Sequence, residues 1–342
     1  MRVKNNYYKD KLRSLKEIFS NEKIELLYDV IVVGENSFPI IDDVIIAISP
    51  SKYTPKVQEL LNVSSKLSSE NFATDIQQTF GDEWETYNKI LPEHKHEFYS
   101  YFDLVDLNDL KDKRVTDLGC GIGRWAHYVS PIAREMVLVD FSDAIFIARN
   151  NLRDNSNCIY IMSDILDLPF RENFSDYIYC LGVLHHLPVD CLDATRELSK
   201  YSNNLLIYLY YGLDNRPFYF RFFLWLVTLL RVLLSRIKSK FVRLILTEIL
   251  MWSLYLPIIS LGRVLSMVGI GRFIPLHEFY SGMSLLRVRQ DVYDRFFTRI
   301  EQRVSIKQIR ELNDTFNAVE ISEKQPYWHF ICRSKDNDLN FD

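Results

Sequence analysis

Three aspartates and a run of glycines carry the clearest chemical signal in this sequence. Each aspartate ends or follows a short apolar run: Asp117, Asp140 and Asp164. Glycines alternate just after the first of them, at Gly119, Gly121 and Gly123. Glycine adopts positive φ at little cost and lets a ligand lie against bare backbone. Backbone N–H groups at the start of a following helix would face that ligand. Such a turn beside fixed carboxylates predicts a ligand-binding crevice.

The elements around these residues alternate between strand and helix patterns. Strands are predicted at Arg114–Leu118, Met136–Asp140, Cys158–Ser163, Tyr177–Leu181 and Asn204–Tyr211. Helices are predicted between them, at Arg124–Ser130, Ser142–Arg153 and Cys191–Tyr201. This alternation predicts a parallel sheet with helices on both faces. The aspartates then lie at strand ends on the carboxyl edge, the side where open α/β sheets bind ligands.

The end of the chain predicts an antiparallel edge for the sheet. Ser305 is placed to cap a helix that runs to Phe316. Two strands follow, Ala318–Ser322 and Trp328–Arg333, joined at Lys324-Gln325-Pro326. A closely coupled terminal pair of strands makes an antiparallel edge on an otherwise parallel sheet. We therefore expect an α/β fold, a Rossmann-like seven-stranded sheet that is mostly parallel with an antiparallel last strand.

The rest of the chain divides around this core, which we place at residues 111–211 and 304–335. Residues 1–60 are expected to form a small N-terminal α+β unit, with a basic amphipathic helix up to about residue 20 and β-type runs within 24–49. Residues 61–110 are expected to be a linker and a helical cap, since 50–75 is rich in Ser, Lys and Asn. A helical insertion is predicted at 212–303, and a disordered tail at 336–342.

Two aromatic-rich segments lie in the predicted cap, at 80–84 and 98–102. Aromatic side chains at this density either pack in the core or cover the crevice, and the sequence leaves both interpretations open. The β-type runs of the N-terminal unit faintly resemble the zinc-ribbon-like domains that begin some methyltransferases, through Phe-Pro-Ile-Ile-Asp at 38–42. The metal-binding cysteines are absent here, so only the shape would remain.

Bulk composition narrows the class of protein. The 342 residues carry a net charge of −4, which argues against a dedicated nucleic-acid binder. The five cysteines form no C-x-x-C pair, a pattern that fits a reducing compartment without structural zinc, and no metal site is expected. The N-terminus is polar and basic without an apolar stretch, so no signal peptide is evident. We expect a cytoplasmic protein, with the inner face of a membrane as a further site.

Four segments, in order, resemble the motifs of the class I S-adenosylmethionine-dependent methyltransferases. They are Asp-Leu-Gly-Cys-Gly-Ile-Gly-Arg-Trp at 117–125, Val-Asp-Phe-Ser at 139–142, Asp-Ile-Leu-Asp-Leu-Pro-Phe at 164–170 and Val-Leu-His-His-Leu-Pro at 183–188. The resemblance covers roughly residues 80–211 and 305–333. It is closest to the type 11/25-like methyltransferase domains, with an N-terminal extension and a helical insertion added. It implies S-adenosylmethionine as cofactor.

The resemblance also implies cofactor-binding roles. Gly119, Cys120 and Gly121 would line the methionine end of the cofactor, with Asp117 near its amino group. Asp140 would accept hydrogen bonds from both ribose hydroxyls. The chemistry of the residues agrees, because a cationic cofactor with a diol suits carboxylates and closely approaching backbone.

Further along the same edge, the resemblance assigns the adenine and sulfonium contacts. Phe141 would lie against the adenine, and Asp164 with Ile165 would contact its amino edge. Leu181 and Gly182 would pass under the sulfonium. Taken singly, an aspartate after a strand is more often a helix cap or turn residue. The placement of all three aspartates at strand ends favours a binding site instead.

The main rival class is a dinucleotide-binding dehydrogenase, because Asp140 also lies about twenty residues beyond the first glycine. However, the glycines run G-x-G-x-G, followed by Arg124 and Trp125 rather than a later glycine. Asp117 and Asp164 also have no role in the dinucleotide fingerprint. The pattern therefore disfavours a dehydrogenase.

Candidate catalytic residues follow the fourth predicted strand and recur in the insertion. His185 and His186 follow that strand, and we expect His186 to face the active centre. A hydrogen-bonded loop histidine is the alternative interpretation. His277 and Tyr280 in the insertion are placed to contact an acceptor, or else to pack within the lid.

The insertion is basic and strongly apolar in an acidic chain. Between Asp214 and Arg272 it holds nine Lys or Arg against two acids. Its longest uncharged run is fourteen residues, shorter than the 18 expected of a spanning helix. Residues 217–272 therefore indicate a peripheral membrane contact or a clasp on an apolar substrate. A helical subdomain that packs on the core, with a homodimer through it, and a true membrane span remain alternatives.

These observations predict an S-adenosylmethionine-dependent methyltransferase. The expected acceptor is a small molecule or an amphipathic, lipid- or glycan-linked group under the lid, with oxygen methylated in preference to nitrogen or carbon. Two alternatives stay open: an RNA methyltransferase that docks through the basic insertion, and a non-catalytic scaffold that keeps the fold.

Overall fold

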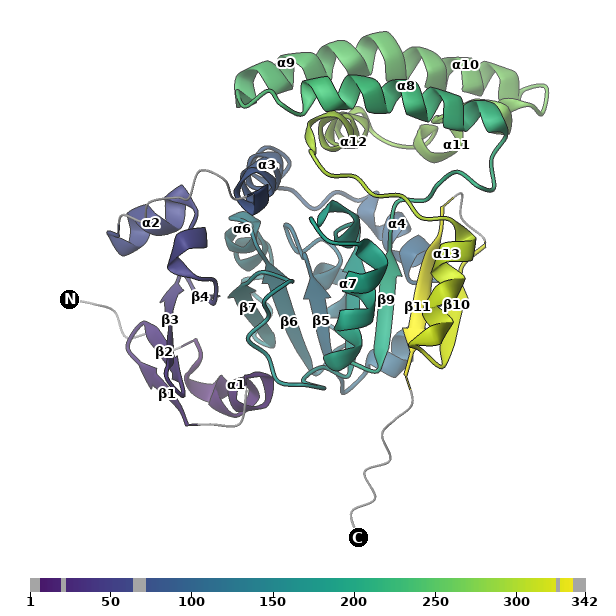
Figure 1. The fold of residues 1–342 in the computed structure, drawn as a ribbon. Helices are drawn as coiled ribbons and strands as arrows, with labels where there is room; N and C mark the ends of the chain where they lie inside the picture. Colours follow the sequence, from purple (N-terminus) through teal and green to yellow (C-terminus); the bar gives the residue numbers. More distant parts are fainter. Residues whose placement is uncertain (1–6, 20–22, 64–71, 324–326, 335–342) are drawn as a thin grey trace.

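One eleven-stranded sheet runs through the centre of the molecule (Figure 1). The computed structural model describes residues 7–19, 23–63, 72–323 and 327–334. The strand order is β1-β2-β3-β4-β7-β6-β5-β8-β9-β11-β10. Every neighbouring pair from β4 to β9 is parallel, and the flanking pairs are antiparallel.

The parallel core follows the sequence prediction closely. Its strands are β5 (Arg114–Leu118), β6 (Glu135–Asp140), β7 (Cys158–Met162), β8 (Tyr177–Leu181) and β9 (Asn204–Tyr208). All residues of β5 to β8 are buried, because helices cover both faces, and this is why these strands appear as unbroken runs without polar alternation.

The predicted antiparallel edge is present at the end of the chain. The last two strands are β10 (Ala318–Ile321), at the edge of the sheet, and β11 (His329–Arg333), next to it. β11 pairs antiparallel with both β9 and β10. The α/β class with a mostly parallel sheet and an antiparallel edge is confirmed, while the predicted turn at 324–326 lies outside the described residues.

The N-terminal strands extend this sheet, which differs from the separate small unit expected for residues 1–60. They are β1 (Ile24–Leu27), β2 (Val30–Val33), β3 (Asn36–Ile41) and β4 (Val44–Ile46). β4 pairs parallel with β7, with Ile45 opposite Ile161. All of β4 is buried, because its side chains enter the apolar cores on the two faces of the sheet: Ile45 on one face, Val44 and Ile46 on the other. Four strands thereby join the seven expected.

Helices cover both faces of the sheet. α1 (Leu12–Ile18), α7 (Cys191–Glu197) and α13 (Ile306–Arg310) contribute to the core on one face. The other face is covered by α2 (Pro55–Leu61), α4 (His94–Tyr101), α5 (Ala126–Val129) and α6 (Ala144–Asn151). α2 lies within the stretch expected to be a linker; Thr54 caps it by accepting a hydrogen bond from the Val57 N–H.

The insertion forms a separate helical layer beyond the carboxyl ends of the strands (Figure 1). Its helices are α8 (Phe218–Leu234), α9 (Lys240–Leu250), α10 (Leu256–Ser266), α11 (His277–Tyr280) and α12 (Leu285–Phe297). α8, α9 and α10 are outermost, and α11 and α12 lie between them and the sheet. We call residues 212–303 the lid. α3 (Phe72–Thr86) lies at the same end of the sheet, beside α12.

A π-helical turn, Met251–Tyr255, joins α9 to α10 in one helix from Lys240 to Ser266. Pro257 follows this turn, and because proline has no N–H it cannot make the regular bond back to the preceding turn. By length and composition alone, this helix is long and apolar enough to cross a membrane. It is the one such helix found among the described residues.

Candidate functional site

The sheet reverses its winding direction between β5 and β8. From β5 the chain proceeds through β6 and β7 on one side, and from β8 it proceeds to β9 on the other. At such a switch point the loops leave in opposite directions and open a crevice at the carboxyl ends of the strands. Asp117, Asp140, Asp164 and Gly182 all lie at this edge. The structure thus brings the predicted cofactor residues together.

The glycine turn after β5 is held against the end of β6. Gly119, Gly121 and Gly123 all have positive φ, at 76°, 52° and 77°. The N–H groups of Gly119 and of the buried Cys120 both donate to the carbonyl of Val139. A Cβ on Gly119 would lie 2.4 Å from a methyl carbon of Val183, so a side chain there would clash. The turn therefore requires glycine for both conformation and space.

Asp140 organises this turn through hydrogen bonds. Its Oδ2 accepts from the Gly121 N–H at 2.8 Å, and its Oδ1 accepts from the N–H and hydroxyl of Ser142. A carboxylate offers about four acceptor positions, so these three bonds leave room for one more. Accepting both ribose hydroxyls, as the sequence implied, would require one of these bonds to open. Burial raises the pKa of Asp140, and the bonds to Ser142 oppose that rise.

Asp117 is a buried carboxylate of the site with one oxygen left unpaired within the described part of the chain. It is 1% exposed, and its Oδ2 has no hydrogen-bond partner among the described residues. Burial raises the pKa of Asp117 to about 8. A cationic group of a ligand beside it would supply the missing partner and favour the charged form.

The N-terminal extension contributes contacts at the far end of the crevice that the sequence did not reveal. Lys52 donates to Oδ2 of Asp164 at 2.7 Å, while Oδ1 accepts from the Leu166 N–H. From α3, Gln77 donates to the carbonyl of Phe141 at 2.7 Å. Ile165 is half-buried and packs against the core. Lys52 and Gln77 therefore bound the predicted adenine side of the crevice.

Helix α3 covers the glycine turn and the end of β8. A Cβ on Gly121 would lie 3.0 Å from the Trp84 ring, so this ring lies directly on the turn. The Phe80 ring lies 5.2 Å from the ring of His186. The 80–84 segment thus covers the crevice, whereas Phe98 and Phe102 of the second aromatic segment pack in the core.

Glu83, on the same helix, is a buried carboxyl group that the sequence analysis missed. It is 2% exposed, and its Oε1 accepts from Gln290 of α12 at 3.2 Å. Its Oε2 has no partner among the described residues. Burial raises the pKa of Glu83 well above its ordinary value, and Asp294 adds to the rise. Only its position beside Trp84, in a helix of mixed pattern, could have drawn attention to it.

The two histidines after β8 have different surroundings. Leu181 ends β8, Gly182 follows with φ of 82°, and both histidines belong to a short 3-10 turn, Leu184–His186. Nδ1 of His186 lies 2.7 Å from the carbonyl oxygen of Ile300. His185 stacks on Tyr210 at 3.9 Å, and neither of its ring nitrogens has a partner among the described residues. Burial lowers the pKa of His185 well below its ordinary value, so it is neutral.

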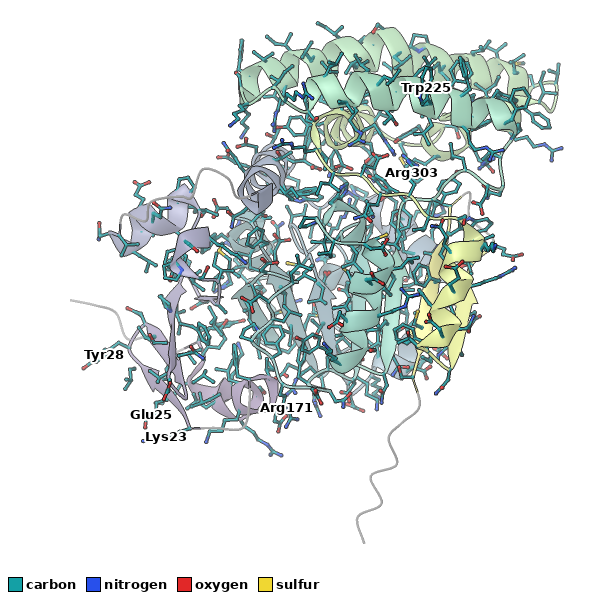
Figure 2. All side chains as sticks on the ribbon, viewed as in Figure 1. Lys23, Glu25, Tyr28, Arg171, Trp225 and Arg303 are labelled. Carbon is teal, nitrogen blue, oxygen red and sulfur yellow. The ribbon has the colours of Figure 1, made fainter. Side chains whose placement is uncertain are left out.

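A charged cluster lies over these histidines, where the lid returns to the sheet. Glu301 pairs with Arg295 at 3.3 Å and with Arg303 at 2.7 Å. Both guanidinium groups lie over the ring of Tyr210, whose hydroxyl donates to Asp294. Burial opposes the charging of Glu301, but the two arginines lower its pKa to about 2. Figure 2 shows Arg303 between the lid and the sheet.

The structure places His277 and Tyr280 inside the lid. Nε2 of His277 lies 2.7 Å from the Ser266 hydroxyl, and its ring packs on Gly262. Tyr280 belongs to the lid's own apolar core and donates to Asp291 at 2.9 Å. No contact links either residue to the glycine turn or to His186 in the part of the chain that the structure describes. These contacts correspond to the packing interpretation.

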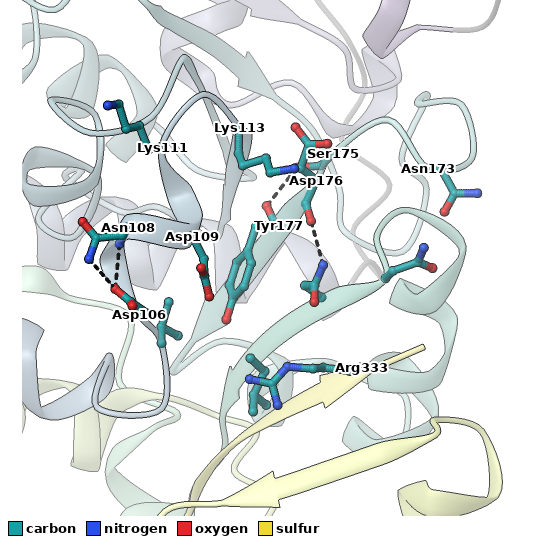
Figure 3. Close-up of a pocket in the computed structure, with 14 residues that line it drawn as sticks. Asp106, Asn108, Asp109, Lys111, Lys113, Asn173, Ser175, Asp176, Tyr177 and Arg333 are labelled. Atoms are coloured by element: carbon teal, nitrogen blue, oxygen red, sulfur yellow. Dashed lines mark hydrogen bonds between the residues drawn. The ribbon is translucent and has the colours of Figure 1, made fainter. Parts of the chain in front are cut away.

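One cavity of about 580 Å³ lies at the other end of the sheet (Figure 3). It is lined by residues at the amino ends of the strands, among them Lys113, Asp176, Tyr177 and Asn204, together with Arg333 at the end of β11. The predicted site residues are not part of its wall. It is therefore distinct from the crevice at the switch point.

Residues 115–203 match the family model described as a methyltransferase domain. Together with the switch-point fold and the glycine and carboxylate site, this match identifies the segment as a class I S-adenosylmethionine-dependent methyltransferase domain, an enzyme domain whose cofactor is S-adenosylmethionine. The residues present fit that cofactor. Gly119 and Gly121 present bare backbone that the Val183 and Trp84 side chains cover, so the Trp84 ring would have to move aside or stack on a bound cofactor. The unpaired Oδ2 of Asp117 suits a cationic group.

Among similar curated proteins are two demethylmenaquinone methyltransferases. That of Staphylococcus saprophyticus is 24% identical over 130 residues, which cover 37% of this chain and 55% of the relative. That of Staphylococcus aureus strain JH9 is 24% identical over 127 residues, covering 36% and 52%. The chain therefore spans about half the length of the curated relatives it matches.

Solved structures with some likeness include a putative S-adenosylmethionine-dependent methyltransferase from Methanococcus maripaludis. It is 16% identical, with 76% of this chain and 96% of that one covered, at a TM-score of 0.40. An S-adenosylmethionine-dependent methyltransferase from Aquifex aeolicus is 18% identical, with 38% and 73% covered, at a TM-score of 0.33.

Proposed function

We propose that this protein transfers a methyl group from S-adenosylmethionine to a small-molecule or lipid- or glycan-linked acceptor bound beneath the lid. The observation that supports it is the meeting of Asp117, Asp140 and the glycine turn at the switch point, under a roof made by α3 and the lid. Each of these features has a chemical counterpart in a cationic cofactor with a diol.

In this proposal the chain's own residues mainly bind, orient and exclude water. The cofactor supplies an electrophilic methyl group when bound. Asp117 neutralises its amino group, Asp140 holds a ribose hydroxyl, and Gly182 lets the backbone pass close beneath it. Effective transfer needs the acceptor atom about 3–3.5 Å from the methyl carbon. Trp84 and Phe80 keep water from that space.

An oxygen acceptor is favoured by the state of His186. A backbone carbonyl can only accept a hydrogen bond, so the close contact with Ile300 requires Nδ1 to carry the proton. Whenever the ring is neutral, this contact leaves the lone pair on Nε2. A hydroxyl becomes acidic as it attacks, and such a lone pair can take its proton.

The acceptor class is suggested by the surroundings of His186. The rings of Phe80 and Tyr210 lie 5.2 and 5.6 Å from its ring, and the two arginines paired with Glu301 lie over Tyr210. An aromatic or amphipathic acceptor that carries a hydroxyl suits this mixture. Because the similar curated proteins are named demethylmenaquinone methyltransferases, the reduced form of demethylmenaquinone, whose ring carries two hydroxyls, is the first acceptor to test.

Cofactor binding gives the first test. A hydrogen bond to a charged group contributes about 1.5–3 kcal/mol, so Asp140→Ala should weaken S-adenosylmethionine binding by about ten- to a hundredfold in calorimetry. Asp154→Ala is the matched control, because its side chain is 92% exposed at the end of α6. Unchanged affinity in Asp140→Ala would overturn the site assignment.

Turnover gives the second test. Transfer of a radiolabelled methyl group to the reduced, quinol form of demethylmenaquinone or to another hydroxylated apolar acceptor would support the proposal. Label on a ring carbon rather than on an oxygen would make it a carbon methyltransferase. Cofactor binding without transfer to any acceptor would favour a scaffold. Transfer to RNA, with binding that falls steeply as salt rises, would favour an RNA methyltransferase.

A further inference from the structure

The outer layer of the lid has its apolar side chains on the outside. Most exposed large apolar side chains of the described chain lie on α8, α9, α10 and the segment that follows. On α8 they recur every three or four residues, along one stripe: Phe218, Phe222, Trp225, Leu229 and Leu233. Figure 2 shows Trp225 on this layer, at the end of the molecule far from Tyr28. We call this surface the outer face.

The second helix of the layer repeats the arrangement. Its exposed apolar residues include Phe241, Ile245, Ile249 and Trp252, again spaced by three or four. Only 22% of the most apolar part of Lys240–Ser266 is buried inside the molecule. Surface helices in water place the apolar stripe toward the core. In this layer the apolar stripes point away from the core instead. This arrangement indicates that the outer face contacts an apolar environment.

The inner side of the same helices carries polar groups that hold the layer to the core. Arg231 donates to the carbonyls of Thr298 and Arg299. Arg243 donates to the Ile237 carbonyl and to the Thr79 hydroxyl. Since these guanidinium groups are bonded to the protein interior, the layer lies on the core with its outer face free, and the long helix is not positioned to span a bilayer.

The charged residues of these helices indicate what binds the outer face. From residue 217 to residue 272 the only acid is Glu248, and it pairs with Arg289 of α12, on the inner side. The exposed charges of the layer are basic, and they lie toward its ends: Arg221, Arg236, Lys238, Arg263 and Arg272. Two copies of this surface would bring like charges together. Anionic lipid head groups would neutralise them, and the apolar stripes would enter the acyl boundary.

We propose that the outer face of the lid docks on the surface of an anionic lipid bilayer, with α8 and α9–α10 lying in the plane of the interface. Trp225 and Trp252 lie on this face with more than half of each side chain exposed, the arrangement expected of interfacial anchors. Docking holds the methyltransferase domain at the membrane with the lid between them. This inference does not depend on the methyl acceptor.

Vesicle co-sedimentation of the full-length protein tests the proposal. We expect binding to vesicles of equal amounts of phosphatidylcholine and phosphatidylglycerol, and much weaker binding to phosphatidylcholine alone. Phe222→Ser with Trp225→Ser should abolish binding. Replacing Arg236 and Lys238 by Gln should weaken it about fivefold for each residue that lies near the surface. Because these side chains are exposed, the variants should unfold like the parent.

The matched control is Leu27→Ser with Tyr28→Ser, two exposed apolar residues on β1 and the turn after it, at the opposite end of the molecule. It should bind vesicles like the parent protein. Equal binding to both vesicle types, or full binding by the Phe222 and Trp225 variant, would overturn the proposal. So would a dimer in light scattering that this variant dissociates, with no vesicle binding by the parent. Protein that resists extraction by high salt and alkali would favour a spanning helix instead.

Discussion

The ammonium group of Lys52 lies 2.7 Å from Oδ2 of Asp164, so a residue of the N-terminal extension neutralises a carboxylate at the carboxyl end of the core sheet. The two side chains are 25% and 12% exposed. The extension that adds four strands to the sheet therefore also completes the wall of the cofactor crevice. Extension and core should behave as one cooperative unit.

Lys52→Met should lower the free energy of unfolding by about 1–2 kcal/mol, between the values typical of exposed and of fully buried ion pairs. Urea denaturation measures this change. Lys23→Met is the control, because Lys23 pairs with Glu25 on an open surface and its side chain is 83% exposed. Equal effects of the two substitutions would contradict the role of Lys52.

The raised pKa of Asp117 makes the free energy of unfolding depend on pH. Its pKa rises from an ordinary value of 3.8 to about 8 on burial. The folded protein therefore keeps a proton that the unfolded chain has lost, and the free energy of unfolding falls as pH rises from about 4 to about 8. The contribution reaches about 1.4 kcal/mol per pH unit. Asp117→Asn should flatten this part of the stability profile.

The same carboxyl group should couple cofactor binding to proton release. A cationic group beside Asp117 stabilises its charged form, so binding below pH 8 should expel a proton and tighten as pH rises. Calorimetry in buffers of different ionisation enthalpy counts this proton. Asp117→Asn should bind without it. Identical proton release by parent and variant would assign the coupling to another group.

Trp84 should report on cofactor binding through its fluorescence. Its ring lies against the bare backbone of Gly121, where the methionine end of the cofactor is expected, so binding must displace or stack on it. Titration with S-adenosylmethionine should change tryptophan emission in the parent protein, and Trp84→Phe should lose most of that change. Trp328→Phe, immediately before β11, is the control and should keep it.

The sequence predicted the parallel core well because its strands are buried on both faces, and such strands appear as short unbroken apolar runs between turns. It missed the partner of β4. Val44–Ile46 shows the same unbroken pattern, but the strand it pairs with, β7, begins more than a hundred residues later. Pairing at that distance depends on tertiary packing, which a local pattern does not encode.

The candidate site likewise contains residues that the sequence pattern could locate and residues that it could not. Asp117, Asp140 and Asp164 could be located because a strand end fixes the position of the next residue. Lys52 and Glu83 could not, since each reaches the crevice from an element whose own pattern is consistent with several orientations. His277 illustrates the converse case: its residue type suggested chemistry, while its contacts with Ser266 and Gly262 show packing within the lid.

Enzyme kinetics should distinguish the roles of His185 and His186. His186→Gln should lower kcat by about 10²–10⁴, the usual contribution of a general base, with little change in cofactor affinity. His185→Phe keeps a ring against Tyr210 and should lower kcat much less. A kcat that His186→Gln leaves unchanged would limit His186 to a structural role.

The buried ion pair between Arg287 and Glu97 should hold the lid to the core. Arg287 of α12 donates to Glu97 of α4 at 2.9 Å, and each side chain is only 6% exposed. Burial would raise the pKa of Glu97, but Arg287 holds it below its ordinary value. Arg287→Met would leave the Glu97 carboxylate, and that of Asp291 on α12, without their shared partner and should cost about 3–5 kcal/mol of unfolding free energy.

Adding Glu97→Gln to Arg287→Met removes one of these stranded charges and should restore part of the loss. Arg196→Met is the control; Arg196 pairs with Asp193, whose side chain is 71% exposed, and its replacement should cost less than about 1 kcal/mol. Limited proteolysis should cut the lid of the Arg287→Met protein before its core, because α12 then loses its charged contact with α4. A lid as resistant as that of the parent would show that its apolar core alone holds it in place.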